Sequence, residues 1–128
     1  MNIPRMIVLL SFLFPSSGFA FKYSQQECTQ IANHLNQTLP MQVDQQTALV
    51  SSTCSVVNDL VTFIYIYELN VKPIINLPSA SKAKAIKKFC SNPDSREFLT
   101  GVSKVHMDYF LEDGVFYERI QFGEEDCY

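Results

Sequence analysis

The most regular apolar pattern of the chain lies at residues 60–67, where seven of the eight side chains are apolar or aromatic. Most are β-branched or aromatic, types that favour the pleated surface of a strand. Because the side chains of a strand alternate between two faces, Phe63, Tyr65 and Tyr67 share one face, while Ile64 and Ile66 share the other. The pattern predicts a central β-strand that is covered on both faces.

A helix is predicted earlier in the chain, at residues 25–38. Ser24 and Glu27 have the spacing of a capping box, in which each side chain satisfies a backbone amide at the start of a helix. Pro40 ends the helix because it has no amide hydrogen to donate. The apolar residues that recur at helical spacing are Cys28, Ile31, Ala32, Leu35 and Leu39.

Residues 47–57 are predicted to form a strand that pairs with the central strand through a turn at Asn58 and Asp59. This turn defines the register of the hairpin. The expected pairs are Val56 with Val61, Cys54 with Phe63, Ser52 with Tyr65, and Val50 with Tyr67.

A second hairpin is predicted at residues 102–111 and 115–122, joined by Asp113 and Gly114, which favour a two-residue turn. On one face, Leu111, Tyr109, Met107 and Val105 lie opposite Phe116, Glu118, Ile120 and Phe122. On the other face, Asp108, Phe110 and His106 lie opposite Arg119, Tyr117 and Gln121.

Two helices are predicted between the hairpins, after a loop at residues 70–79 that contains two prolines. The first helix spans residues 80–90. The second is capped by Asn92, begins at Pro93 and ends at Gly101. The order of elements predicts an α+β fold, with an antiparallel sheet of about four strands and helices on one face. It leaves the order of the strands in the sheet open.

The first twenty residues have the pattern of a secretory signal peptide: Arg5, an apolar run at residues 6–14, and small residues up to Ala20. Cleavage after Ala20 leaves residues 21–128 as a single domain, in the periplasm or outside the cell. No later stretch is apolar over the roughly 20 residues that a transmembrane helix needs. Loss of Arg5 takes the net charge from −3 to −4, and an acidic balance argues against nucleic-acid binding.

The four cysteines are Cys28, Cys54, Cys90 and Cys127. An even number in a small exported domain indicates two disulfides, for which three pairings exist. A metal site is disfavoured because no two cysteines lie close in sequence, and no cofactor is expected. We favour the pairing of Cys28 with Cys54, because it attaches the first helix to the aromatic face of the first hairpin. Cys90 then pairs with Cys127.

Charged residues suggest one candidate surface. Lys84, Lys87 and Lys88 share the polar side of the helix at residues 80–90 and could contact an anionic lipid, a lipopolysaccharide or a sulfated sugar. The second disulfide would also tether the acids at residues 124–126 beside these lysines and partly neutralise them. Those acids lack the ligand spacing of a calcium loop, so a solvated tail is expected.

No catalytic residues are predicted. His34 and His106 have no nucleophile and orienting group arranged around them in the sequence, and paired cysteines provide no thiol. The last hairpin does hold four carboxylates that could serve a glycoside hydrolase: Asp108, Glu112, Asp113 and Glu118. Turn formation explains Asp113, and pairing with Arg119 explains Asp108.

The aromatic row is the remaining candidate for binding. Tyrosine suits a half-wet interface because its ring is apolar while its hydroxyl needs a polar partner. Tyr65 and Tyr67 either pack under the first helix or form a groove for a peptide or a partner strand.

The chain also resembles a group of small exported Gram-negative proteins called quorum-sensing-regulated virulence factors. The residues that carry the resemblance are Pro40, Met41, Val43, Asp44, Thr47, Tyr65, Tyr67, Cys90, Asn92, Pro93, Arg96, Phe98, Leu99, Gly101, Val102 and Cys127. The resemblance implies export and an α+β fold, and it supplies no catalytic residues. Arg96 belongs to the shared motif, and we expect it to form a salt bridge with Asp44.

The function predicted from these features is binding of a protein or an envelope component, without catalysis. Two alternatives come from other functional classes. The first is a small inhibitor of a hydrolase from a host or a rival cell. The second is a hydrolase that uses the carboxylates of the last hairpin.

Overall fold

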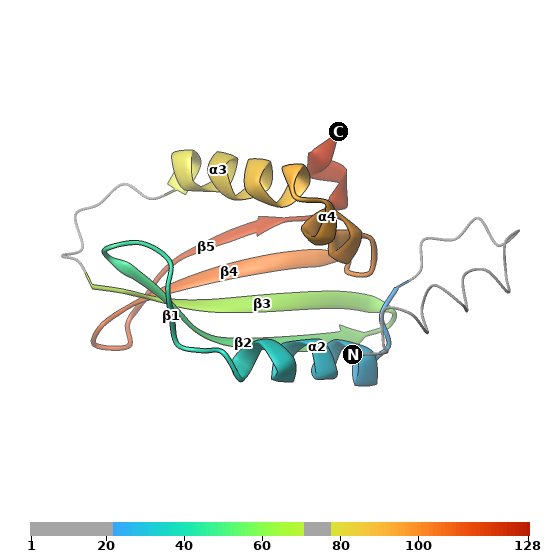
Figure 1. Cartoon of the computed structure of the whole chain (residues 1–128), viewed down its shortest axis with the longest axis horizontal. Helices are drawn as coiled ribbons and strands as arrows, with labels where there is room; N and C mark the ends of the chain where they lie inside the picture. Colours follow the sequence, from blue (N-terminus) through green and yellow to red (C-terminus); the bar gives the residue numbers. More distant parts are fainter. Residues whose placement is uncertain (1–21, 71–77) are drawn as a thin grey trace, which may run out of the picture.

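A computed structural model describes residues 22–70 and 78–128, with side chains in the second range described from Lys82 onward. The predicted signal peptide and most of the predicted loop at residues 70–79 therefore lie outside the described residues. The elements are α2 (Gln25–Asn36), β1 (Met41–Gln42), β2 (Thr47–Val57), β3 (Leu60–Leu69), α3 (Pro78–Ser91), α4 (Pro93–Thr100), β4 (Lys104–Leu111), β5 (Phe116–Phe122) and the 3-10 helix η1 (Glu124–Cys127) (Figure 1).

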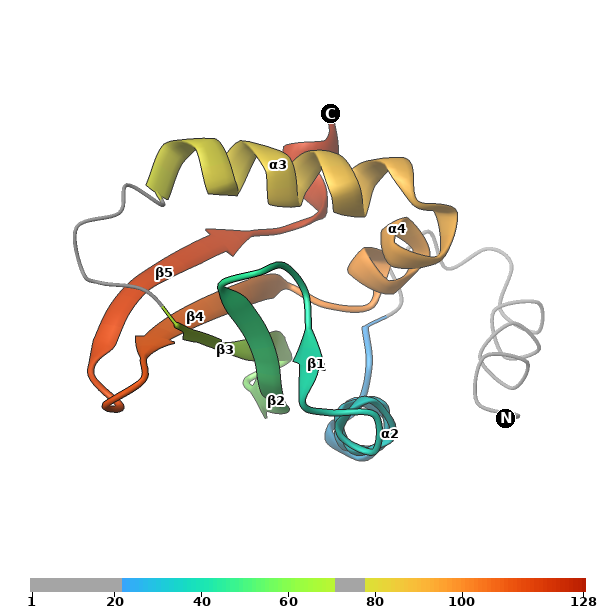
Figure 2. The same cartoon turned by 60° about the vertical axis from the view of Figure 1, so that its left-hand side comes forward.

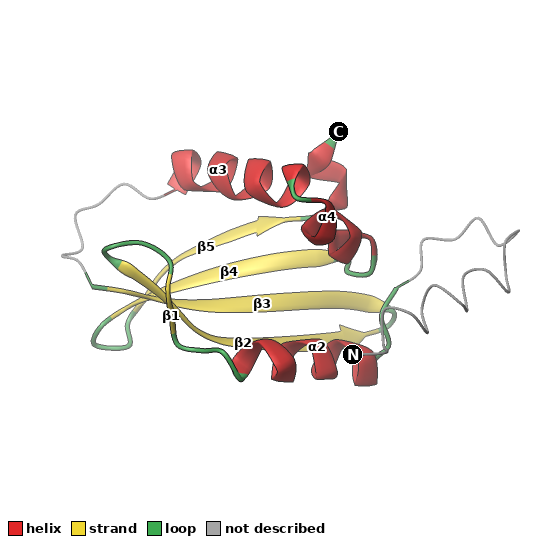
Figure 3. Cartoon of the chain, in the orientation of Figure 1, coloured by secondary structure: helices red, strands yellow, loops and turns green. Residues whose placement is uncertain are grey.

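The strands form one sheet in the order β1-β2-β3-β4-β5 (Figure 3). The two predicted hairpins, β2-β3 and β4-β5, are antiparallel, whereas β3 and β4 pair in parallel. A parallel pair needs a long crossover connection, and here the chain between the two strands contains α3 and α4. The α+β class is confirmed, with the two-residue strand β1 as an additional edge.

All three described α-helices lie on the same side of the sheet, as predicted (Figure 2). They bury a core between themselves and the inward face of β3, β4 and β5. The buried members of that core are Cys28, Ala32, Val61, Phe63, Leu99, Val102, Val105, Met107, Ile120 and Phe122.

Within the described chain, helices cover only one of the two faces of β3. Figure 2 shows no described helix over the outward face. Ile64 and Ile66 lie there and are only half-buried. Their cover comes from side chains on the neighbouring strands, because Ile64 pairs with Thr53 and His106, and Ile66 pairs with Ser51 and Asp108.

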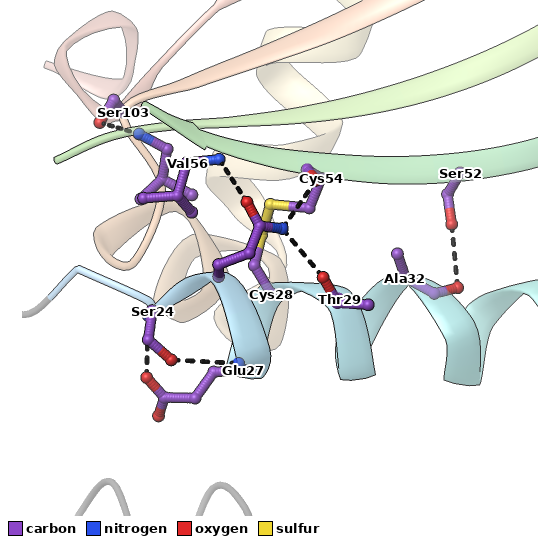
Figure 4. The surroundings of a disulfide bond; sticks show 11 residues. Ser24, Glu27, Cys28, Thr29, Ala32, Ser52, Cys54, Val56 and Ser103 are labelled. Carbon is purple, nitrogen blue, oxygen red and sulfur yellow. Dashed lines mark hydrogen bonds between the residues drawn. A yellow bond between two sulfur atoms is a disulfide. The ribbon is translucent and has the colours of Figure 1, made fainter. Parts of the chain in front are cut away.

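Local capping signals place the helices close to their predicted bounds. In α2, Ser24 Oγ accepts from the amide of Glu27 at 3.1 Å, while the Glu27 carboxylate accepts from the amide of Ser24 at 2.9 Å (Figure 4). In α4, the Asn92 side chain accepts from two backbone amides of the first turn. α2 ends at Asn36, two residues before the predicted end, and α3 begins at Pro78, two residues before the predicted start.

Both predicted registers are correct up to a β-bulge, which adds one residue to one strand of a pair. In the first hairpin the shift falls between Leu49 and Ser51, so that Tyr67 pairs with Leu49 rather than Val50. In the second, a shift next to Tyr109 pairs Phe110 with Phe116 instead of Tyr117.

The helix α2 covers a free edge of the sheet with side-chain amides. On the side of β2 that faces away from β3, β1 pairs with it only at residues 48 and 49, so most of that edge has no neighbouring strand. Gln25 donates to the carbonyl of Cys54 at 3.1 Å and accepts from the amide of Val56 at 2.9 Å. Asn36 bonds both the amide and the carbonyl of Ser52, at 2.8 and 2.9 Å. These amides replace the peptide groups of a missing strand.

The structure contains disulfides between Cys28 and Cys54 and between Cys90 and Cys127. The first joins α2 to β2, next to a hydrogen bond from the hydroxyl of Ser52 to the carbonyl of Ala32 (Figure 4). The second joins the end of α3 to η1. Each bridge thus attaches a helix to a segment distant in sequence.

Candidate binding surface

Three tyrosines lie side by side on the helix-bearing face of the sheet, and we call this group the tyrosine floor. Tyr65 and Tyr67 come from β3, and Tyr109 comes from β4. Parallel pairing sets Tyr67 directly beside Tyr109, with ring centroids 4.8 Å apart and planes 14° from parallel. The rings of Tyr65 and Tyr67 are 6.4 Å apart. All three side chains are half-buried.

The tyrosine floor rests against a continuous set of aromatic contacts. The ring centroid of Phe63 lies 5.0 Å from that of Tyr65. Phe98 of α4 contacts Phe63 edge-to-face, with the ring centroids also 5.0 Å apart. Phe89 of α3 contacts both Tyr65 at 6.0 Å and Phe122 of β5 at 5.2 Å. Edge-to-face contacts of this kind favour defined ring orientations. The floor is therefore held by residues from two strands and two helices.

The loop after β1 brings an acidic group, Asp44, near the tyrosine floor. α2 and α3 run along opposite edges of the sheet, and α4 lies at one end (Figure 1). Asp44 follows β1, in a loop held by a hydrogen bond from the amide of Val43 to the carbonyl of Thr47. Burial, and then the charge of Asp44, raise the pKa of the Tyr109 phenol above its ordinary value. The exposed apolar residues Met41 and Val43 precede Asp44 in the chain.

The hydroxyls of the floor have no hydrogen-bond partner within the described residues. Burial raises the pKa of Tyr65, and burial together with the neighbouring phenols raises the pKa of Tyr67. Both groups therefore stay protonated at neutral pH and can donate a hydrogen bond as well as accept one. Apolar rings with available hydroxyls are typical of surfaces that bind proteins.

The carboxylates predicted for the hydrolase alternative are not brought together. Asp108 is buried and binds Arg119 through two hydrogen bonds of 2.7 and 2.9 Å on the outward face. Glu118 pairs with Tyr109, whose side chain lies on the helix-bearing face. Two carboxylates on opposite faces of a sheet cannot flank one glycosidic bond. Glu112 and Asp113 are exposed at the hairpin turn.

The two histidines also lie apart. His34 is exposed on α2, and His106 lies on the outward face of β4. Burial, and then the nearby charge of Arg119, lower the pKa of His106, and its buried Nδ1 has no hydrogen-bond partner. No group of three potential metal-ligating side chains occurs in the described residues.

The basic residues take positions that differ from two expectations. Arg96 does not pair with Asp44; its guanidinium lies over the ring of Tyr128, 5.0 Å from the centroid. Three lysines of α3, Lys84, Lys87 and Lys88, are exposed. They form no ion pair with the acids at 124–126; within the described chain the sole ion pair joins Arg119 and Asp108. The disulfide tether alone does not hold opposite charges in contact.

Sequence reasoning missed Tyr109 as a member of the binding surface. The alternation within its strand placed it on the apolar face, but nothing local indicated that Tyr67 would be its neighbour. That relationship depends on the parallel pairing of β3 with β4.

Comparisons with known proteins find similarity in the fold alone. No protein-family profile and no curated protein matches the chain. A crystal structure of a Pseudomonas aeruginosa protein described as secreted matches with a TM-score of 0.66 and 13% identity, over 81% of this chain and 92% of that one. The type II secretion system pilotin EpsS of Vibrio vulnificus matches with a TM-score of 0.57 and 15% identity, over 81% of this chain and 91% of the pilotin. The pilotin AspS of Vibrio cholerae matches with a TM-score of 0.54 and 17% identity, over 80% of this chain and 91% of the pilotin.

None of the helices that the structure describes is long and apolar enough to cross a bilayer.

Proposed function

We propose that the protein is an exported, non-enzymatic binding protein of the Gram-negative cell envelope, and that the tyrosine floor holds a protein partner. The observation that carries this proposal is the group of three half-buried tyrosines whose hydroxyls have no partner in the described chain. A partner that offers apolar side chains to the rings and polar groups to the hydroxyls would complete this surface.

The structural likenesses support an envelope role. Two of the matching proteins are type II secretion system pilotins, and a third is described as secreted. We infer that the partner is likewise a component of the envelope or of a secretion assembly. Membership of the quorum-sensing-regulated group, and with it a part in virulence, stays a prediction from the sequence resemblance.

Cleavage after Ala20 is a prediction from the sequence, and it would keep the contacts made by Lys22 and Tyr23. The ammonium group of Lys22 donates to the carbonyls of Thr100 and Val102, at 3.3 and 3.0 Å. The amide of Tyr23 donates to the carbonyl of Gly101 at 2.9 Å. Cleavage after Ala20 would therefore leave these anchoring contacts in the mature protein.

Site-specific photocrosslinking tests the proposal. A benzoylphenylalanine residue replaces Tyr67 or Tyr109 in one pair of variants, and Thr53 or Phe110 on the outward face in a control pair. After irradiation of living cells, we expect a discrete adduct with an envelope protein from the first pair only. Adducts that form equally from both pairs, or from neither, would refute the binding role of the floor. An adduct with a hydrolase would instead support the inhibitor alternative.

A further inference from the structure

The outer side of α3 carries a row of three exposed lysines: Lys84, Lys87 and Lys88. The opposite side of the same helix packs into the core through Ile86 and Phe89. Since residues three and four apart lie on one face of a helix, the three ammonium groups form a compact basic row that faces solvent. We call it the α3 basic row.

No carboxylate of the described residues forms an ion pair with this row, although η1, which carries three acids, packs against α3. The sequence of α3 contains neither Asp nor Glu, and none of its described lysines forms an ion pair. In the acidic segment tethered to α3 by the second disulfide, Asp126 accepts instead from the amide of Gly123 at 2.9 Å. A concentrated positive surface thus persists on a chain whose net charge is −3.

The chemistry of the row favours a lipid surface over a protein. Protein interfaces are depleted in lysine, and their binding energy centres on Trp, Tyr and Arg. Among the α3 side chains that the structure describes, from Lys82 onward, the exposed neighbours of the row are Ala83 and Ser91, which offer no such anchor. Lysines near an anionic bilayer are attracted individually and need no shaped pocket. We propose that the α3 basic row rests against the anionic phospholipid headgroups of a membrane.

The position of α3 in the fold suits this contact. It is the outermost helix on its side of the sheet, and α2 lies along the far edge (Figures 1 and 2). A bilayer against α3 would therefore leave the tyrosine floor, which lies between the two helices, open to a protein. The membrane contact does not depend on the proposed function of that floor.

Vesicle co-sedimentation tests the proposal with a charge-matched control. One variant of the mature protein carries Lys84→Gln, Lys87→Gln and Lys88→Gln. The control carries Gln26→Glu, Gln30→Glu and Asn33→Asp on the exposed side of α2, which changes the net charge by the same three units. Each protein is mixed with vesicles of phosphatidylcholine alone or with about one third phosphatidylglycerol, at low ionic strength and at 0.5 M salt. Circular dichroism melting checks that all three proteins are folded.

We expect the wild type to sediment with the anionic vesicles only, and to be released by salt. The lysine variant should lose about 100-fold in partitioning, since each lysine near an anionic surface contributes about 1 kcal/mol. The α2 variant should lose less than about 5-fold. Equal losses in both variants would mean that only net charge matters, which overturns the proposal. If the wild-type protein does not sediment with anionic vesicles but binds soluble polyglutamate, the lipid proposal is overturned in favour of an acidic protein partner.

Discussion

The rings of Tyr67 and Tyr109 stack at 4.8 Å although the two residues belong to different hairpins. The stack exists because β3 and β4 run in parallel at the centre of the sheet. It joins the two halves of the chain on the helix-bearing face. Changes at this junction should therefore affect both the fold and the candidate binding surface.

Alkaline pH should destabilise the protein through the tyrosine floor. Burial raises the pKa of Tyr65 above its ordinary 10.0. Above pH 10 the unfolded chain therefore releases a proton that the folded chain retains. The contribution of this phenol to the unfolding free energy is fully present below pH 10 and decreases as the pH rises further. In urea unfolding at pH 8, 10 and 11, the unfolding free energy should decrease less with pH for Tyr65→Phe than for the wild type.

The control for this pH dependence is Tyr128→Phe, since Tyr128 is 85% exposed. It should leave the slope of the unfolding free energy with pH unchanged. If Tyr65→Phe and Tyr128→Phe behave alike, the alkaline transition does not arise from the buried phenol.

Removal of the edge-covering amides should lower the unfolding free energy, and by more at Asn36, whose bonds are partly buried, than at Gln25, whose bonds are exposed. Gln25→Ala loses the bonds to Cys54 and Val56, and should lower the unfolding free energy by about 1–2 kcal/mol. Asn36→Ala leaves both backbone groups of Ser52 without their partner, and should cost about 2–3 kcal/mol. Chemical denaturation measures both losses.

Gln30→Ala is the matched control for these edge variants, because Gln30 is exposed on the same helix. Its effect should stay within about 0.5 kcal/mol. Light scattering gives a second measurement, since an uncovered strand edge promotes association between chains. Edge variants as stable and as monomeric as the control would contradict the proposed role of the amides.

Gly101→Ala should destabilise the protein by overpacking rather than by backbone strain. Gly101 has φ −90°, which any residue adopts, but an added Cβ would overlap the ring of Tyr23. We expect a cost of about 1–3 kcal/mol that disappears in a Tyr23→Ala background, as a double-mutant cycle can measure.

Gly114→Ala provides the contrast. Its φ of +86° is strained for alanine, but nothing lies within 4 Å of the new Cβ. The cost of about 1–2 kcal/mol should persist in the Tyr23→Ala background. If removal of Tyr23 changes the stability loss of both glycine variants to the same extent, steric overlap with Tyr23 is not the cause of the loss in Gly101→Ala.

The two disulfides should contribute unequally. Each closes a loop of similar length, with sequence separations of 26 and 37, so loop-closure entropy gives each about 3–4 kcal/mol. Cys28 is fully buried in the core, whereas Cys90 and Cys127 are half-buried. Cys28→Ala with Cys54→Ala should therefore cost more in urea unfolding than Cys90→Ala with Cys127→Ala, because it also leaves a cavity. The reverse order would show that loop closure outweighs burial.

Signals close together in the sequence determined much of the local structure. The capping box of Ser24 and Glu27 and the cap at Asn92 positioned the helices. Asn58 and Asp59 adopt the positive φ angles, 50° and 64°, that a tight hairpin turn requires. Alternation along β3 placed Tyr65 and Tyr67 on one face. All these features depend on interactions between residues a few positions apart.

Only the tertiary structure decided which hairpins became neighbours, where each β-bulge fell and what covered the edge of β2. The parallel contact that makes Tyr109 part of the floor follows from the path of the chain through α3 and α4. The separation of Asp108 from Glu118 and the unpaired state of the lysines on α3 likewise depend on packing across the whole domain. Contacts between distant segments reflect the combined burial of many side chains, and no local pattern specifies that sum.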